Sequence, residues 1–278
     1  MAKRGLMFSG VAIIALALVW LYLIFPGMAK LPADYEKTYH FDGSVQIAGA
    51  TGALSPQIPT KMDRDLKATD VNESDALIIQ QVIKFMTADG RPLSTLDPRL
   101  AALDSTETYA IDRTTRENVA GGDKSRTGQF TFPANTKQET YQFWSATTGT
   151  ALSAAFAGEE EIDGLKVYVF KIDSKDNAYP NAANGAPQKV DVATTIKVEP
   201  VSGTPIFTTT KTTVRMQVAA NTLIPVLINE STFTQATVDE AVAEGKSNRS
   251  LILWASVYGF WAAVGLGAVL LVIGLVKK

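Results

Sequence analysis

Cysteine is absent from this chain of 278 residues, and histidine occurs once, at His40. The lack of cysteine excludes disulfides, thiolate metal sites, iron–sulfur clusters and cysteine nucleophiles. A single histidine excludes two-histidine metal motifs and any catalytic network that needs several imidazoles. Nucleophile-elbow, zinc-protease and P-loop motifs are also missing. The sequence therefore predicts no cofactor and no enzymatic activity.

A surplus of positive charge is missing as well. The chain carries 26 basic and 28 acidic residues, which gives a formal net charge of -2. A protein that neutralises nucleic-acid phosphates needs a basic surplus, so no nucleic acid is expected as a partner. With 46% hydrophobic and 19% charged residues, the chain is too apolar to be disordered.

Charge is also absent from two long apolar segments, residues 6–25 and 251–276. A helix that rises about 1.5 Å per residue needs about 20 residues to cross a hydrocarbon core of about 30 Å. Each segment is therefore predicted to be a transmembrane helix. The alternative for the first segment is a cleaved signal peptide, but the apolar region of a signal has only about 7–15 residues.

Basic residues predict the orientation of both spans. Lys3 and Arg4 precede the first span, and Lys277 and Lys278 follow the second. The positive-inside rule then places both termini in the cytoplasm of a two-pass cell-membrane protein. The expected order is a cytoplasmic stub 1–5, transmembrane helix 6–25, an extracytoplasmic domain 31–250, transmembrane helix 251–276 and a cytoplasmic end 277–278. Membrane lipid is an expected partner.

Small residues recur at four-residue spacing in the second span, at Ala255, Gly259, Ala263 and Gly267. A face of small side chains lets helices approach closely in lipid. This face is a candidate contact with the first span, with other membrane subunits or with a second copy of the chain. The alternative is that Gly and Ala are simply common in membrane helices.

The region between the spans is predicted to be mainly β, built from antiparallel strands and hairpins. Period-two patterns and β-branched runs predict strands at residues 35–47, 76–87, 107–111, 129–132 and 141–144. One hairpin joins 154–162 to 165–173 across Asp163-Gly164, and a second joins 192–199 to 206–218 across 200–203. A loop is expected over 179–188, and a short helix over 238–246 with its capping box at Thr237. The run Thr208–Thr213 is polar on both faces, which does not fit a lipid-facing strand.

Few residues between the spans suggest a site. Glu159 and Glu161 share one strand face and are the candidate metal ligands, but a solvated run is the preferred interpretation. Asn72 and Asn229 begin possible glycosylation sequons. The aromatic cluster 141–144 either stacks on a sugar or lipid headgroup or packs in the core, and core packing is preferred.

Three strings carry a family resemblance. They are Pro133 with Lys137-Gln-Glu-Thr-Tyr-Gln-Phe-Trp144, then Phe156-Ala-Gly-Glu-Glu-Glu-Ile-Asp-Gly-Leu-Lys-Val-Tyr-Val-Phe170, then Val198-Glu-Pro-Val-Ser-Gly203. With the two-span layout, they closely resemble the PorA-like porin family, a domain family of unknown function. The resemblance implies a membrane-anchored, β-rich ectodomain.

Three classes of function stay open. The preferred one is a non-enzymatic structural or interaction role in the cell envelope, for example as an accessory subunit of a membrane complex. The alternatives are transport, as an oligomeric porin-like channel or a conduit for lipid or apolar ligands, and a carbohydrate- or cation-binding module. A pore formed by this chain alone is not expected, because neither span carries a charge or an amide side chain. An apolar tunnel would favour transport, whereas a packed core with an exposed apolar patch would favour partner binding.

Overall fold

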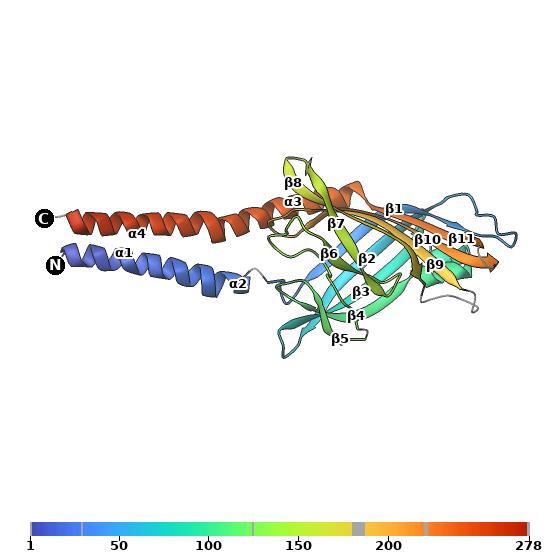
Figure 1. Cartoon of the computed structure of the whole chain (residues 1–278), viewed down its shortest axis with the longest axis horizontal. Helices are drawn as coiled ribbons and strands as arrows, with labels where there is room; N and C mark the ends of the chain where they lie inside the picture. The colour runs from blue at the N-terminus through green and yellow to red at the C-terminus, as the bar shows by residue number, and fades with distance from the viewer. Residues whose placement is uncertain (1, 29, 124, 180–186, 220–221, 277–278) are drawn as a thin grey trace. The chain divides into compact units, whose positions relative to one another are not determined.

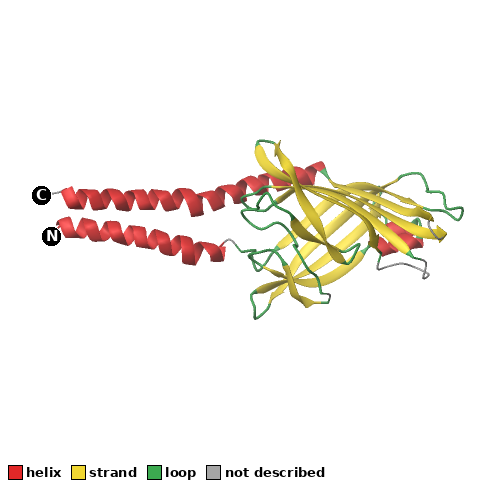
Figure 2. Ribbon diagram, in the orientation of Figure 1, coloured by secondary structure: helices red, strands yellow, loops and turns green. Residues whose placement is uncertain are grey.

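The structure is a computed structural model that describes residues 2–28, 30–123, 125–179, 187–219 and 222–276. The chain forms two compact units. One unit comprises Met1–Leu31 and Lys246–Lys278, and the other comprises Pro32–Gly245. The predicted fold class, a mainly β domain with an apolar helix at each end of the chain, is confirmed (Figures 1 and 2).

Two long helical segments carry the apolar runs. The first comprises α1 (Ala2–Val19), the π-helical turn η1 (Trp20–Ile24) and α2 (Phe25–Met28), and the second comprises α3 (Gln235–Leu253), the π-helical turn η5 (Trp254–Tyr258) and α4 (Gly259–Val276). Each contains a window that is long and apolar enough to cross a membrane. Within the helical unit α1 packs along α4, and the indole Nε1 of Trp20 donates to the carbonyl oxygen of Ala255 at 2.8 Å.

Helix α3 begins one turn earlier than expected. The backbone N–H of Thr237 donates to the hydroxyl oxygen of Thr234 at 3.2 Å, so Thr234 is the capping residue. The predicted cap, Thr237, lies inside the first turn. Its hydroxyl donates to the carbonyl oxygen of His40 instead, at 3.1 Å. The expected capping box at Thr237 is therefore wrong, because Thr234 offers the same hydroxyl chemistry three residues earlier.

In the part of the chain that the structure describes, eleven antiparallel strands form one sheet. They are β1 (Glu36–Ile47), β2 (Ile58–Val71), β3 (Ala76–Thr87), β4 (Ser105–Asp112), β5 (Asn118–Gly122), β6 (Tyr141–Ser145), β7 (Thr150–Ile162), β8 (Leu165–Ala178), β9 (Gln188–Val198), β10 (Pro205–Ala219) and β11 (Thr222–Phe233). The strand order is β5-β4-β3-β2-β1-β11-β10-β9-β8-β7-β6. Strands that are neighbours in the chain are neighbours in the sheet, except that β5 and β6 lie at opposite edges. The first strand, β1, also pairs with the last, β11.

The connection between the two edge strands closes the sheet into a barrel. Gln129 bridges antiparallel to Glu117, just before β5, and parallel to Phe143 on β6. Its backbone N–H donates to the carbonyl oxygen of Gln142 at 2.5 Å, and the N–H of Trp144 donates to its carbonyl oxygen at 3.2 Å. On the other side Gly128 accepts from the N–H of Asn118 and Phe130 donates to Arg116, so residues 128–130 fill the seam that would otherwise leave two open edges. The curl of the sheet brings β7 in front of β2 and β3 in Figure 1.

The sheet confirms most predicted strands and corrects one. Strand β3 has the expected bounds, and both predicted hairpins form, with Asp163 and Gly164 at positive φ in the first turn. Gln129–Phe132 is not a strand, because only Gln129 bridges to neighbours. Strands β2, β5 and β11 were not expected. Most of the loop expected over 179–188 lies outside the described residues.

The outer face of the barrel is partly charged. Cross-strand ion pairs there include Lys211–Glu230 at 2.6 Å and Lys197–Glu160 at 2.6 Å. A strand that faces lipid needs apolar side chains at every second position, so these outer positions suit water. Another part of the outer face is covered by the first half of α3, where Gly245 lies against Leu165 and Ile206.

Candidate functional site

Two adjoining cavities lie inside the barrel. Their volumes are about 330 Å³ and about 250 Å³. The residues that line both are Phe41, Arg64, Phe130, Trp144, Ala146, Thr147, Thr208, Thr210 and Thr212. These residues come from β1, β2, β6, β10, the turn between β6 and β7, and the connection that closes the barrel. The larger cavity falls within the range of about 300–1,000 Å³ that is usual for small-molecule sites.

Apolar clusters flank the cavities. Phe132, Phe143 and Phe170 belong to one buried cluster, and the Phe132 ring centroid lies 4.3 Å from that of Phe170. A second cluster is built on Val45, Phe85, Leu93 and Leu100. Phe143 lines the smaller cavity and Phe85 the larger one. The barrel interior is therefore filled by side chains at the two clusters, and the cavities adjoin these clusters.

An arginine stands in the wall that both cavities share. Arg64 on β2 donates from Nε and Nη2 to Oε1 of Gln81 on β3, at 3.0 and 2.8 Å. The hydroxyl of Tyr109 on β4 donates to the same oxygen at 3.2 Å. Gln81 is only 3% exposed, so three donors converge on one buried acceptor. This network fixes Arg64 and leaves it without a carboxylate partner among the described residues.

A second arginine in the larger cavity is neutralised. Arg126 forms an ion pair with Glu107, and its guanidinium carbon lies 3.6 Å from the centroid of the Tyr109 ring. Arg126 is only 6% exposed. Burial raises the pKa of the Tyr109 hydroxyl, so this phenol stays neutral beside the guanidinium. The pair supplies little net charge to the cavity.

Unpartnered polar atoms gather at the larger cavity. Among the described residues, six buried side-chain nitrogen or oxygen atoms have no protein hydrogen-bond partner. Four of them belong to residues that line this cavity: Nε of Arg126, Nε1 of Trp144, Oδ1 of Asn118 and Oδ1 of Asn229. Buried polar atoms in native proteins are almost always satisfied. Their concentration in one place indicates a site that takes a polar partner.

The threonine-rich strand supplies part of the polar lining. Thr208, Thr210 and Thr212 on β10 line both cavities, whereas Thr209 bonds across the strands to the hydroxyl of Thr232 at 2.7 Å. Both faces of the run Thr208–Thr213 are polar, which does not fit a lipid-facing strand. One of these faces forms a polar stripe along the barrel interior.

The strings that carry the family resemblance meet in the structure. The N–H of Asn135 donates to the carbonyl oxygen of Val201 at 3.0 Å, and the N–H of Thr136 donates to that of Pro200 at 2.8 Å. The carboxylate of Glu199 is fully buried and accepts from the backbone N–H of Ser202 at 2.7 Å. These contacts hold the β9–β10 turn against the segment before β6.

Comparison with known proteins agrees with this layout. The family model of porin PorA matches residues 4–276. The chain belongs to the porin PorA family. No curated protein matches this PorA-family chain. Among solved structures, the crystal structure of Rv2717c from M. tuberculosis is similar at 11% identity and a TM-score of 0.25, over 71% of this chain and 92% of that one.

The candidate metal ligands of this PorA-family protein do not converge. Glu159 on β7 pairs with Lys166 on β8 at 2.8 Å and accepts from Nε2 of Gln138 at 2.7 Å. Glu161 lies opposite Lys166 in the strand register. Across the described residues, no group of three or more histidine or acidic side chains is placed to hold a metal ion.

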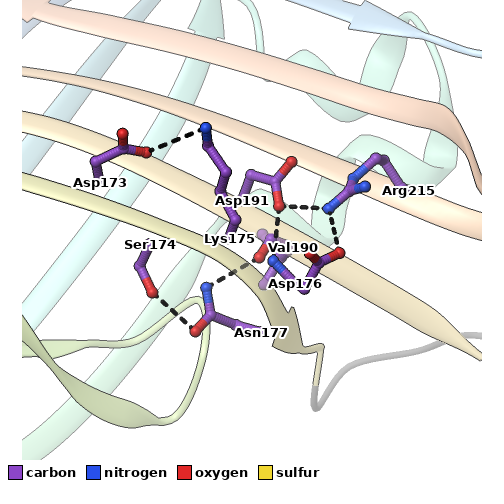
Figure 3. Close-up of polar contacts among 8 residues, drawn as sticks. All are labelled: Asp173, Ser174, Lys175, Asp176, Asn177, Val190, Asp191 and Arg215. Carbon is purple, nitrogen blue, oxygen red and sulfur yellow. Dashed lines mark hydrogen bonds and ion pairs between the residues drawn. The ribbon is translucent and has the colours of Figure 1, made fainter.

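A cluster of acidic side chains around Arg215 lies near the end of β8 and the start of β9 (Figure 3). Arg215 donates to Oδ1 of Asp176 at 2.9 Å and to Oδ1 of Asp191 at 2.5 Å. The N–H of Asp176, which has a φ of 57°, also donates to Asp191 at 2.9 Å. The register shifts here, so the arginine ties a β-bulge to two neighbouring strands. The cluster is structural.

The two sequons lie in different surroundings. Oδ1 of Asn72 accepts from the N–H groups of Ser74 and Ala76, both at 3.0 Å, in the turn between β2 and β3. Glycosylation at Asn72 stays a prediction. Asn229 is 8% exposed and lines the larger cavity, so the folded barrel leaves no room for a glycan at this position. The expectation for Asn229 is corrected on this ground.

The small residues of the second span lie toward α1. Ala255, Gly259 and Ala263 line an apolar groove together with Leu16 and Trp20 of the first span. Gly267 is buried, and a Cβ at this position would lie 2.8 Å from the carbonyl oxygen of Gly10.

Sequence reasoning missed Arg64, Gln81 and Arg126. Arg64 alternates with Met62 and Leu66 on β2, so a cation on an otherwise apolar strand face was the available signal. The aromatic cluster was interpreted as core. Phe143 is buried in the core cluster, whereas Trp144 lines both cavities with its indole N–H unpartnered.

Proposed function

We propose that this member of the porin PorA family is a non-enzymatic, membrane-anchored protein of the cell envelope that binds a small amphipathic molecule inside its barrel. The observation that carries the proposal is the pair of adjoining cavities, which have aromatic walls and buried unpartnered polar atoms. Sites with this mixture of apolar surface and a few placed polar groups are typical of small-molecule binding.

The size of the cavities supports an organic ligand. At a liquid share of about 30 Å³ per molecule, the larger cavity alone has room for on the order of ten water molecules. Single structural waters occupy far smaller sites. The aromatic side chains of Phe41, Phe130 and Trp144 in the shared wall favour a ligand with an apolar part.

The proposed membrane topology follows from the basic residues that flank the two candidate spans. The two candidate spans anchor the chain, both termini face the cytoplasm, and the barrel is extracytoplasmic. In this arrangement the barrel holds its ligand on the extracytoplasmic side of the membrane. The charged outer face of the barrel supports a domain that stands in water and carries cargo inside it, as in the conduit form of transport, and argues against strands that line a pore in lipid.

Trp144 provides a direct test. It is the one tryptophan between the two candidate spans, because the other three are Trp20, Trp254 and Trp261. Replacing those three with Phe leaves a single reporter in the cavity wall. The full chain in mild detergent is titrated with bromoundecanol, whose bromine quenches indole fluorescence on contact. Saturable quenching of Trp144 is expected, and quenching that rises without saturation would contradict the proposal.

A matched pair of variants on β10 localises the binding. Thr208 lines both cavities, whereas Thr213 is not among the residues that line either one. Thr208→Phe fills part of the cavity and is expected to lower the affinity for the probe, measured by quenching, by at least about tenfold. Thr213→Phe adds the same side chain elsewhere on the strand and is expected to leave the affinity unchanged. Equal effects of the two substitutions would place the probe outside the barrel.

A second candidate function rests on the helical unit. The groove lined by Ala255, Gly259 and Ala263 has a volume of about 400 Å³ and is almost wholly apolar. It offers a seat for a helix of another membrane subunit, which fits the accessory-subunit role. Purification in mild detergent tests this role: a stoichiometric membrane partner that is lost in Ala263→Leu supports it, and a chain that purifies alone contradicts it.

A further inference from the structure

We propose that the barrel selects an anionic amphiphile, a molecule with a carboxylate or phosphate head that binds Arg64 and an aliphatic tail that lies among apolar residues of the larger cavity. The inference rests on the proposed function, because it names the class of ligand that the same cavities take. It is carried by the balance of charge inside the barrel.

The charges of the cavity walls do not cancel. Among the residues that the structure describes, three charged ones line the two cavities: Arg64, Arg126 and Glu107. Arg126 and Glu107 form an ion pair. Arg64 remains, and within the described part of the chain its polar neighbours are neutral, namely the amide of Gln81 and the hydroxyl of Tyr109. A half-buried guanidinium in a cavity wall without a counter-charge favours an anionic ligand, since charged groups withdrawn from water are normally paired.

The geometry of Arg64 leaves a donor for that ligand. Its Nε and Nη2 are both engaged by Oε1 of Gln81, so the Gln81 contact fixes one edge of the guanidinium. The Nη1 edge has no protein acceptor among the described residues. Because Arg64 lines both cavities, an anion at this edge would be reachable from either one. Guanidinium groups bind carboxylate and phosphate oxygens through charge-assisted hydrogen bonds, which are stronger than neutral ones.

Apolar side chains continue from Arg64 along the larger cavity. Met62 lies two residues before Arg64 on β2 and pairs in register with Phe85, and both line this cavity. Leu103 and Leu227 line it as well. A head at Arg64 therefore places a tail against an aliphatic and aromatic wall. The indole N–H of Trp144 and Nε of Arg126 offer further donors to an oxygen-rich head.

Three bromine-labelled probes of equal chain length test the selection. They are bromoundecanoate, bromoundecyl phosphate and the neutral bromoundecanol, each titrated at neutral pH into the single-tryptophan protein with Trp144 as reporter. We expect at least one anionic probe to bind about tenfold or more tightly than the alcohol. Tighter binding of the carboxylate identifies that head as the preferred anion, and tighter binding of the phosphate identifies the phosphate.

Variants at Arg64 assign the preference. Arg64→Gln is expected to abolish the anion preference, so that the two anionic probes bind this variant no more tightly than bromoundecanol does. Arg64→Lys keeps a positive charge and is expected to retain part of the preference, which a purely structural role would not predict. Lys61→Gln removes a cation from an exposed position three residues earlier on β2 and is expected to change nothing. Far-UV circular dichroism checks that each variant is folded.

The outcomes separate this inference from the proposed function. Equal binding of acid, phosphate and alcohol to the wild-type chain would overturn the anionic selection and leave the binding function intact. An anion preference that survives in Arg64→Gln would also overturn it. If no probe quenches Trp144 saturably, both the proposed function and the inference are wrong.

Discussion

Gly10 and Gly267 face each other in the helical unit, and a Cβ built on Gly10 would lie 2.6 Å from the carbonyl oxygen of Gly267. Neither position has room for a side chain. Helices in lipid associate through such close packing. The hydrophobic effect does not drive this association, because lipid tails are as apolar as the helix surfaces. We predict that Gly267→Leu separates the two spans.

Distance measurement checks this prediction. The chain has no native cysteine, so spin labels attach only at introduced ones. Cysteines at the exposed positions Phe8 and Val272 report the distance between the spans by electron paramagnetic resonance. Gly267→Leu should lengthen that distance. Gly265→Leu is the control, because a Cβ at Gly265 meets nothing within 4 Å. An unchanged distance in Gly267→Leu would show that the glycine contact is dispensable.

The seam of the barrel gives a second prediction. The N–H of Gln129 donates to the carbonyl oxygen of Gln142, and proline at position 129 removes that donor. We expect Gln129→Pro to open the seam between β5 and β6 and to speed amide hydrogen exchange at Asn118 and Trp144, which bond to the same segment. Gln129→Ala keeps the backbone donor and should leave both amides protected. Equal exchange in the two variants would mean that the backbone bond does not hold the seam.

Strands were predictable where β-branched residues cluster and a turn follows. Strand β3 was placed correctly because its run is rich in isoleucine and valine and ends at the turn 88–90. Strand β11 was missed because Pro225 interrupts its pattern. In the sheet this proline lies at a shift of register against β10, which is where a strand tolerates the loss of an N–H.

The site could not be predicted from the sequence, because its parts are far apart in the chain. Arg64, Gln81 and Tyr109 meet only through the pairing of three strands, and Trp144 reaches the same cavities from β6. Sequence patterns report which face of a strand is apolar. They do not report which cation, here Arg64, lacks a carboxylate partner once the strands have closed into a barrel.

Two turn glycines give a third prediction, in which conformational strain and steric clash are separated. Gly164 and Gly203 have nearly equal φ values, 76° and 75°. A Cβ at Gly164 meets nothing within 4 Å, so Gly164→Ala should cost only the strain of a left-handed residue, about 1–2 kcal/mol in the free energy of unfolding. A Cβ at Gly203 would lie 2.3 Å from the carbonyl oxygen of Phe132, so Gly203→Ala should cost more, above about 3 kcal/mol.

Urea unfolding of both variants, followed by the fluorescence of Trp144 in the single-tryptophan background, checks this difference. The comparison is internal, since the two substitutions add the same methyl group at nearly the same φ. Similar losses in the two variants would mean that the contact between the β9–β10 turn and the segment before β6 relaxes at little cost.

The alkaline stability of the barrel gives the last prediction. Burial raises the pKa of the Tyr35 hydroxyl from 10.0 to about 12, because the phenolate is poorly solvated in the wall of the smaller cavity. In the unfolded chain Tyr35 loses its proton above about pH 10, while the folded chain keeps it to about pH 12. The unfolded state therefore binds fewer protons in this window, and the free energy of unfolding falls as pH rises from about 10 to about 12. The contribution of Tyr35 is fully present below pH 10. Replacing it with Phe should make this decline shallower, as measured by urea unfolding across the window, and parallel curves for wild type and Tyr35→Phe would show that Tyr35 ionises equally in both states.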